Sequence, residues 1–123
     1  MGIDIYAEWD GQTEVERKAQ FTGFSISHGH VGYLREAYHG GPYATEVLVP
    51  EALEQNGEHV SIPTATLRER LPEAVEAARV RAHHIYNEDA SEDHPMVKSL
   101  RAFVDLIERL EHEGKHPRIR ASC

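Results

Sequence analysis

The sequence predicts an α+β fold, with an N-terminal antiparallel β-sheet and two C-terminal helices packed on it. The length of 123 residues indicates a single domain with one core, spanning 1–123. Aromatic residues and glycine-containing turns are concentrated in the first 45 positions, which is typical of short strands and indicates the sheet. Two apolar stripes with helical period in the second half indicate the two helices.

The N-terminal half is predicted to form a meander of short strands. Apolar and polar residues alternate over 3–9, which is the period of a strand with one buried face. Thr13 and Glu16 have the spacing of a capping box, so a short helix is expected over 14–20. Further strands, separated by turns, are expected over 21–27, 31–38 and 43–49, followed by a brief helix over 50–56 that starts at a proline.

The first of the two long helices carries an apolar stripe at spacings of four and three. Thr66 and Glu69 form a second capping-box pattern at its start. Pro72 predicts a kink or a restart, because proline is tolerated only in a first turn. The stripe consists of Leu71, Val75, Ala78, Ala82 and Ile85.

The second long helix is expected to begin at Asp93 as N-cap, with Pro95 in its first turn, and to end at Gly114. Its stripe consists of Met96, Leu100, Phe103, Ile107 and Leu110. Both stripes are expected to cover one face of the sheet. Residues 118–121 then predict an edge strand with Ile119 inward and two arginines outward.

The charge balance narrows the range of partners. A net charge of −8 is atypical of proteins that bind duplex nucleic acid or acidic membranes. No apolar run approaches the roughly 20 residues of a membrane span, and no signal-peptide pattern is visible. The single cysteine, Cys123, excludes an internal disulfide framework. These features predict a protein of the cytoplasm.

Nine histidines raise the question of a metal or of acid–base catalysis. His28 and His30 flank Gly29, and a third ligand would have to come from His39, His94 or an aspartate of the acidic loop 88–93. An H-x-H pattern alone is weak, and surface turns often contain histidine. The loop lacks calcium-site spacing. No nucleophile motif is present. We therefore predict no metal, no cofactor and no catalytic residue.

The segment 33–43 has a composition suited to a small nucleotide. Aromatic rings stack on bases, arginine pairs with phosphate, and backbone N–H groups beside glycines bind anions. The alternative is a tyrosine-rich sheet surface with a Gly-Gly hairpin. The tail 115–123 has no acidic side chain, which favours a small anion. The residues that carry this interpretation are Arg35, Tyr38, His39, Arg118 and Arg120.

Three segments resemble the first Thoeris anti-defence family of phage and prophage proteins. They are MGIDIY at 1–6, GYLREAYHG at 32–40 and IRAS at 119–122, and the resemblance extends over nearly the whole chain. It implies the same α+β fold and a cytoplasmic role in the bacterial host. Such proteins bind cyclic ADP-ribose isomers made by bacterial TIR enzymes, hold them uncleaved between two subunits, and in some cases form hexamers that also bind cyclic oligonucleotides.

The resemblance also implies roles for particular residues. Arg35, Arg118 and Arg120 would contact the pyrophosphate, and Tyr86 would stack on the base. Asn87 would bond a ribose or base edge, and the loop 87–93 would close over the ligand. The turn at His28, Gly29 and His30 would supply backbone N–H groups. The acidity of the loop is a departure, because carboxylates repel a bis-phosphate.

Two other functions stay open at this point. One is a small hydrolase that cleaves such a nucleotide with the histidine cluster. The other is a phage protein that blocks a host enzyme by direct contact through its acidic N-terminal half.

Overall fold

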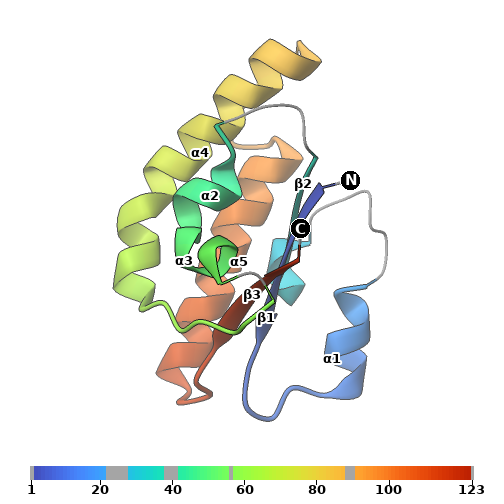
Figure 1. Cartoon of the computed structure of the whole chain (residues 1–123), viewed down its shortest axis with the longest axis vertical. Coiled ribbons are helices and arrows are strands. Elements are labelled where there is room, and N and C mark those ends of the chain that lie inside the picture. The colour runs from blue at the N-terminus through green and yellow to red at the C-terminus, as the bar shows by residue number, and fades with distance from the viewer. Residues whose placement is uncertain (1, 22–27, 38–41, 56, 88–90, 123) are drawn as a thin grey trace.

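The computed structural model describes residues 2–21, 28–37, 42–55, 57–87 and 91–122. It confirms the α+β class, with a three-stranded antiparallel sheet and two long helices (Figure 1). The strands are β1 (Gly2–Glu8), β2 (Tyr33–Ala37) and β3 (Arg118–Ser122). The helices are α1 (Glu14–Ala19), the 3₁₀ turn η1 (Gly29–Val31), α2 (Ala44–Leu48), α3 (Pro50–Glu54), α4 (Thr64–Tyr86) and α5 (Pro95–His112).

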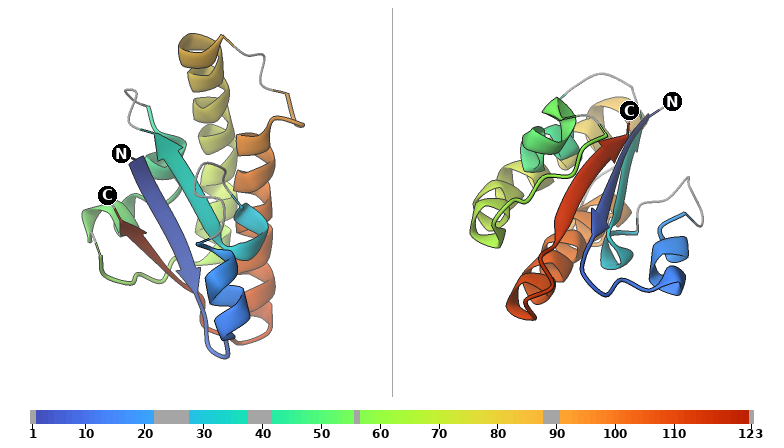
Figure 2. Two further views of the ribbon diagram at one scale, coloured as in Figure 1. Left: turned by 90° about the vertical axis from the view of Figure 1, so that its right-hand side faces the viewer. Right: turned by 60° about the horizontal axis from the view of Figure 1, so that its bottom comes forward.

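The helices lie on both sides of the sheet. Figure 2 shows α2, α3, α4 and α5 together on one side, whereas α1 lies on the opposite side. The core fills the space between the sheet and the long helices, with Ile5, Leu34, Phe103 and Ile107 fully buried. We call the other side, which carries the even-numbered side chains of β1, the outer face. Within the described residues, no helix combines the length and the apolar character that crossing a bilayer requires.

Strand β1 is the centre of the sheet, in the order β2-β1-β3. The predicted alternation of apolar and polar residues in this strand is confirmed, because Ile3, Ile5 and Ala7 are buried in the core. The C-terminal edge strand is confirmed as well, with Ile119 only 1% exposed. The N- and C-terminal segments of the chain therefore lie side by side in one sheet.

The predicted meander is wrong. Residues 43–49 do not form a strand, because Ala44–Leu48 is helix α2 and Pro50 starts α3 directly afterwards. Glu36 is the physical reason: its buried carboxylate accepts hydrogen bonds from the first two N–H groups of α2. The expected strand at 31–38 is shorter, since Val31 belongs to η1. Apart from Phe21, the expected strand at 21–27 lies outside the described residues.

The long helices follow their apolar stripes, with differences at their ends. Four members of the α4 stripe are buried, but Ile85 is 37% exposed. Helix α4 begins at Thr64 after Pro63, so the Thr66 capping box is not its start. Pro72 causes no restart, because it lies on the exposed side, where water can reach the carbonyl that it leaves unbonded.

Helix α5 is capped by His94 rather than Asp93. The His94 ring nitrogen accepts from the Met96 N–H at 3.2 Å, and Pro95 occupies the first turn as expected. Gly114 follows the helix with φ of 71°, which confirms its predicted role at the end. The Thr13–Glu16 capping box of α1 is complete, and the short helix starting at Pro50 is also confirmed.

Candidate functional site

Two of the predicted phosphate-binding arginines lie on the outer face. Arg35 lies opposite Asp4 in the β1–β2 register, and Arg120 lies opposite Tyr6 in the β1–β3 register. Side chains alternate along a strand, so both arginines project from the same side as Asp4 and Tyr6. They flank the central strand, although 84 residues of chain lie between them.

Each arginine is held by a carboxylate and by a tyrosine. Arg35 donates to Asp4 Oδ1 at 2.7 Å, and the Tyr33 hydroxyl donates to the same oxygen at 2.7 Å. The Arg120 guanidinium carbon lies 4.6 Å from the Tyr6 ring centroid, a cation–π contact. Its Nε is 3.5 Å from Glu8 Oε1. The side chains of Arg35 and Arg120 are 30% and 26% exposed, so an anion can reach both.

Burial and neighbouring charges fix the protonation of these groups. Burial, followed by the hydrogen bond to Asp4, raises the pKa of Tyr33 far above its ordinary value of 10.0. Burial and the negative charge of Asp4 raise the pKa of Tyr6 as well. The hydrogen bond to Asp4 raises the pKa of Arg35 further. At neutral pH the outer face therefore presents neutral phenol rings beside the Arg35–Asp4 and Arg120–Glu8 pairs.

Arg118 does not join this pair. It lies opposite Glu8, but its guanidinium bonds Asp10 Oδ1 at 3.0 Å and the His116 carbonyl. The hydrogen bonds from His116 and Arg118 lower the pKa of Asp10. The Arg118 side chain is therefore engaged in a separate ion pair at the end of β3.

The turn at His28, Gly29 and His30 is packed against the interior. A Cβ on Gly29 would lie 1.9 Å from the Ser99 carbonyl oxygen on α5, so only glycine fits there. The Gly29 N–H faces the Ser99 hydroxyl at 3.5 Å, and the His28 N–H bonds the Tyr33 carbonyl. These two N–H groups are engaged inside the protein, in contrast to the predicted anion-binding role.

The remaining predicted ligand residues are placed only in part. Tyr38 and His39 lie outside the described residues. Tyr86 is the last residue of α4, and Asn87 follows it in the left-handed conformation with φ of 52°. Both residues therefore belong to the end of a helix rather than to the outer face of the sheet.

The acidic loop has a described member with a clear role. Glu92 bonds Arg101 at 2.7 and 2.8 Å and Arg79 at 2.7 Å, and these bonds lower its pKa. One carboxylate thus links α4 to α5. At this position of the acidic loop, the carboxylate forms ion pairs with two arginines.

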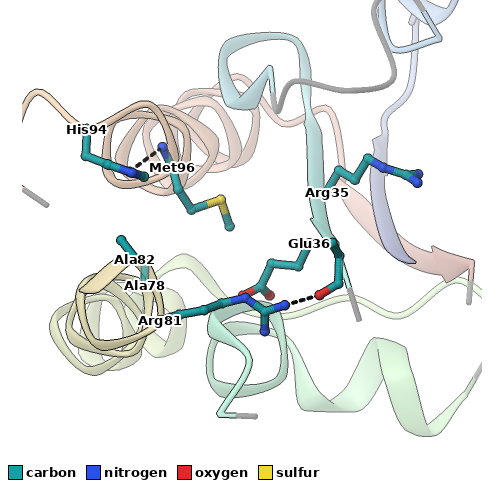
Figure 3. Close-up of a pocket in the computed structure, with 8 residues that line it drawn as sticks. Arg35, Glu36, Ala78, Arg81, Ala82, His94 and Met96 are labelled. Carbon is teal, nitrogen blue, oxygen red and sulfur yellow. Dashed lines mark hydrogen bonds between the residues drawn. The ribbon is translucent and has the colours of Figure 1, made fainter. Parts of the chain in front are cut away.

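A small cavity opens at the end of β2, between α4 and α5 (Figure 3). Its volume is about 120 Å³, and Ala78, Ala82 and Met96 form its apolar lining. Arg81, 7% exposed, lies over the Tyr43 ring at 4.6 Å and donates to the Ala37 carbonyl. In Figure 3 the Arg35 side chain points away from this cavity, as its place on the outer face requires.

Arg81 is the residue that sequence analysis missed. It lies between Ala78 and Ala82, so the helical period places it beside the apolar stripe of α4. A charged residue at a buried helix position is unusual unless it is paired. That position is the signal by which the sequence could have indicated it.

Neither a metal centre nor a relative identifies the chemistry of the chain. Within the described residues, no three or more histidine, cysteine, aspartate or glutamate side chains lie close enough together to hold a metal ion. No family model, curated protein or solved structure matches the chain.

Proposed function

We propose that this protein binds a cyclic ADP-ribose-type signalling nucleotide and sequesters it without cleaving it. The observation that carries the proposal is the position of Arg35 and Arg120 on one face of the sheet, on either side of β1, with Arg120 against the Tyr6 ring. The two guanidinium groups project from β2 and β3, the strands that flank β1, and each can take one phosphate of a pyrophosphate, since arginine binds phosphate through paired N–H donors. The resemblance to the Thoeris anti-defence family supplies the class of nucleotide.

The carboxylates of Asp4 and Glu8 determine which anions the two arginines favour. They hold the arginines in place, and they also balance the two positive charges. A singly charged anion gains little by competing with them, whereas a pyrophosphate offers two charges to two arginines at once. The pair therefore favours a compact bis-anion over a monoanion.

The proposal includes a homo-oligomer, a dimer or a hexamer, that acts against a bacterial defence system in the cytoplasm of the host. The resemblance implies a ligand held between two subunits, and it also implies that some such oligomers bind cyclic oligonucleotides. The net charge of −8 supports a small ligand over duplex nucleic acid.

Recovery of the ligand tests the proposal. The purified protein is mixed with a cyclic ADP-ribose isomer, freed of unbound ligand and denatured by heat, and the released material is analysed by chromatography. Intact ligand in the released fraction is the expected result. A cleaved product would show an enzyme and direct attention to the histidines. If nothing is retained or consumed, the proposed function is wrong.

A further inference from the structure

A second hollow lies beside α1 and is separate from the cavity of Figure 3. It has a volume of about 420 Å³ and is lined by Gln12, Glu14, Arg17, Lys18 and Phe21. That volume falls within the range of about 300–1,000 Å³ typical of small-molecule sites. Helix α1 itself has no buried residue among its six, and the adjoining Gln20 fastens it to the sheet. The wall of the hollow is thus a helix that contributes nothing to the core.

Gln12 is the unusual member of this lining. Both atoms of its side-chain amide are shielded from solvent and have no hydrogen-bond partner in the part of the chain that the structure describes. Buried polar groups are almost always paired, and an unpaired one favours any partner that enters. The glutamine side chain turns about its own torsions, so its amide can reach a molecule in the hollow.

Phe21 joins the hollow to the outer face. Its ring stacks on Tyr6 with centroids 5.2 Å apart, and Tyr6 carries Arg120. Phe21 is nevertheless 41% exposed, which is high for so large an apolar side chain. An exposed aromatic ring beside polar groups is a platform on which a planar base can stack.

The charges around the hollow favour an anionic group. Among the described residues that line the hollow, Arg17 and Lys18 accompany one carboxylate, Glu14, which lies 3.3 Å from the Lys18 ammonium. The charged side chains among these described lining residues therefore sum to a positive charge, on a protein whose net charge is −8. The Arg17 side chain forms no hydrogen bond or ion pair within the described residues, and it is exposed.

We propose that this hollow binds the adenine base of a nucleotide and that Gln12 recognises the base. The amide of Gln12 turns into the hollow, donates to adenine N7 through Nε2 and accepts from the N6 amino group through Oε1. Phe21 stacks on the base, and Arg17 and Lys18 contact a phosphate. The assignment rests on the proposed function for the identity of the natural ligand, but a simple mononucleotide tests it separately.

The experiment compares AMP, IMP and ribose 5-phosphate by titration calorimetry on the full chain. IMP replaces the donor at position 6 with an acceptor, so one of the two Gln12 bonds is lost. We expect AMP to bind about tenfold more tightly than IMP, on the scale of a bidentate amide–adenine pair, and ribose 5-phosphate to bind more weakly than either. Equal affinities for AMP and IMP, or no binding of AMP at millimolar concentration, would overturn the assignment.

Two variants and one spectrum complete the test. Gln12→Met should remove the preference for AMP over IMP, whereas Gln55→Met, which changes an exposed glutamine on α3's C-terminal side, should keep it. In ¹H–¹⁵N spectra of the wild type, AMP should shift the side-chain NH₂ signals of Gln12, identified by their absence in Gln12→Met. Unmoved Gln12 signals would count against the proposal even if AMP binds. Failure of the proposed function appears instead in the ligand-recovery assay with the cyclic ADP-ribose isomer.

Discussion

At the scale of single residues, the proposed function assigns Arg35 and Arg120 to ligand binding rather than to maintaining the fold. Replacing either with alanine should weaken binding of a cyclic ADP-ribose isomer by about 1.5–3 kcal/mol, the scale of a charge-assisted hydrogen bond. Both ion pairs are partly exposed, so the free energy of unfolding should fall by no more than about 1 kcal/mol. Calorimetry and urea denaturation measure the two effects.

Arg109→Ala is the matched control for these variants, because Arg109 is an exposed arginine near the end of α5. It should leave both binding and stability unchanged. If Arg35→Ala or Arg120→Ala unfolds the protein without changing the affinity of the remaining folded fraction, these arginines are structural and the proposed site is wrong.

Gln20 is the residue whose side chain anchors the polypeptide next to α1. It is 1% exposed, and its Nε2 donates to the carbonyls of Ala7 and Val31 at 2.8 Å and of Gly32 at 3.3 Å. Gln20→Met keeps the volume but leaves buried carbonyls unpaired, so we expect a loss of about 2–3 kcal/mol in unfolding free energy. Gln55→Met should change it by less than about 0.5 kcal/mol. A similar small effect at Gln20 would contradict the anchoring role.

At the scale of elements, the start of α2 depends on one carboxylate from β2. Glu36 accepts from the N–H groups of Ala44 and Thr45 at 2.8 and 2.7 Å, and from the Thr45 hydroxyl at 2.6 Å. Glu36→Gln replaces one acceptor oxygen with a donor that faces an N–H group, and should cost about 2–3 kcal/mol of stability. The comparison is Glu46→Gln, an exposed change in the same helix, which should cost less than about 0.5 kcal/mol.

Thermal denaturation of these two variants measures the difference. Equal melting temperatures would mean that α2 forms without help from β2. That outcome would also remove our explanation for why residues 43–49 are helical.

At the scale of the whole molecule, stability should fall at both ends of the pH range. Hydrogen bonds from arginines lower the pKa values of Glu51, Glu92 and Glu108 below the ordinary 4.5. As the pH falls below about 4.5, the unfolded chain binds protons before the folded protein does, so acid favours unfolding. At alkaline pH the raised pKa values of Tyr6 and Tyr33 also lower the stability of the fold. Above about pH 10 the unfolded chain loses these protons while the folded protein keeps them, so alkali favours unfolding.

Urea denaturation at a series of pH values tests this profile. Tyr33→Phe should lower stability at neutral pH, since it removes the hydrogen bond to Asp4, and should reduce the further loss above about pH 10. An alkaline decline as steep as that of the wild type would show that Tyr33 does not cause it.

Local patterns predicted the elements that depend on near neighbours in the chain. The alternation in β1 and the stripe of α5 were sufficient because each reflects one face turned to the core. The capping box of α1 was sufficient because all its partners lie within four residues. At 43–49 the local pattern failed, since the deciding partner, Glu36, belongs to another element.

The same distinction between local signals and distant partners applies to the candidate site. The sequence indicated Arg35 and Arg120 by residue type alone, and could not show that they share a face. The position of Arg81 beside the apolar stripe of α4 indicated a buried side chain, but not its contact with the Tyr43 ring. Nothing local marked the unpaired amide of Gln12.

The sequence by itself therefore determined the α+β class, the two long helices, the C-terminal strand and the presence of arginines suited to anions at positions 35, 118 and 120. The tertiary structure decided the strand order β2-β1-β3, the helical state of α2 and the placement of Arg35 and Arg120 on one face, on either side of β1. The physical reason is one of range. Periodicity and capping act over a few residues, whereas the pairing of strands depends on burying the whole core at once.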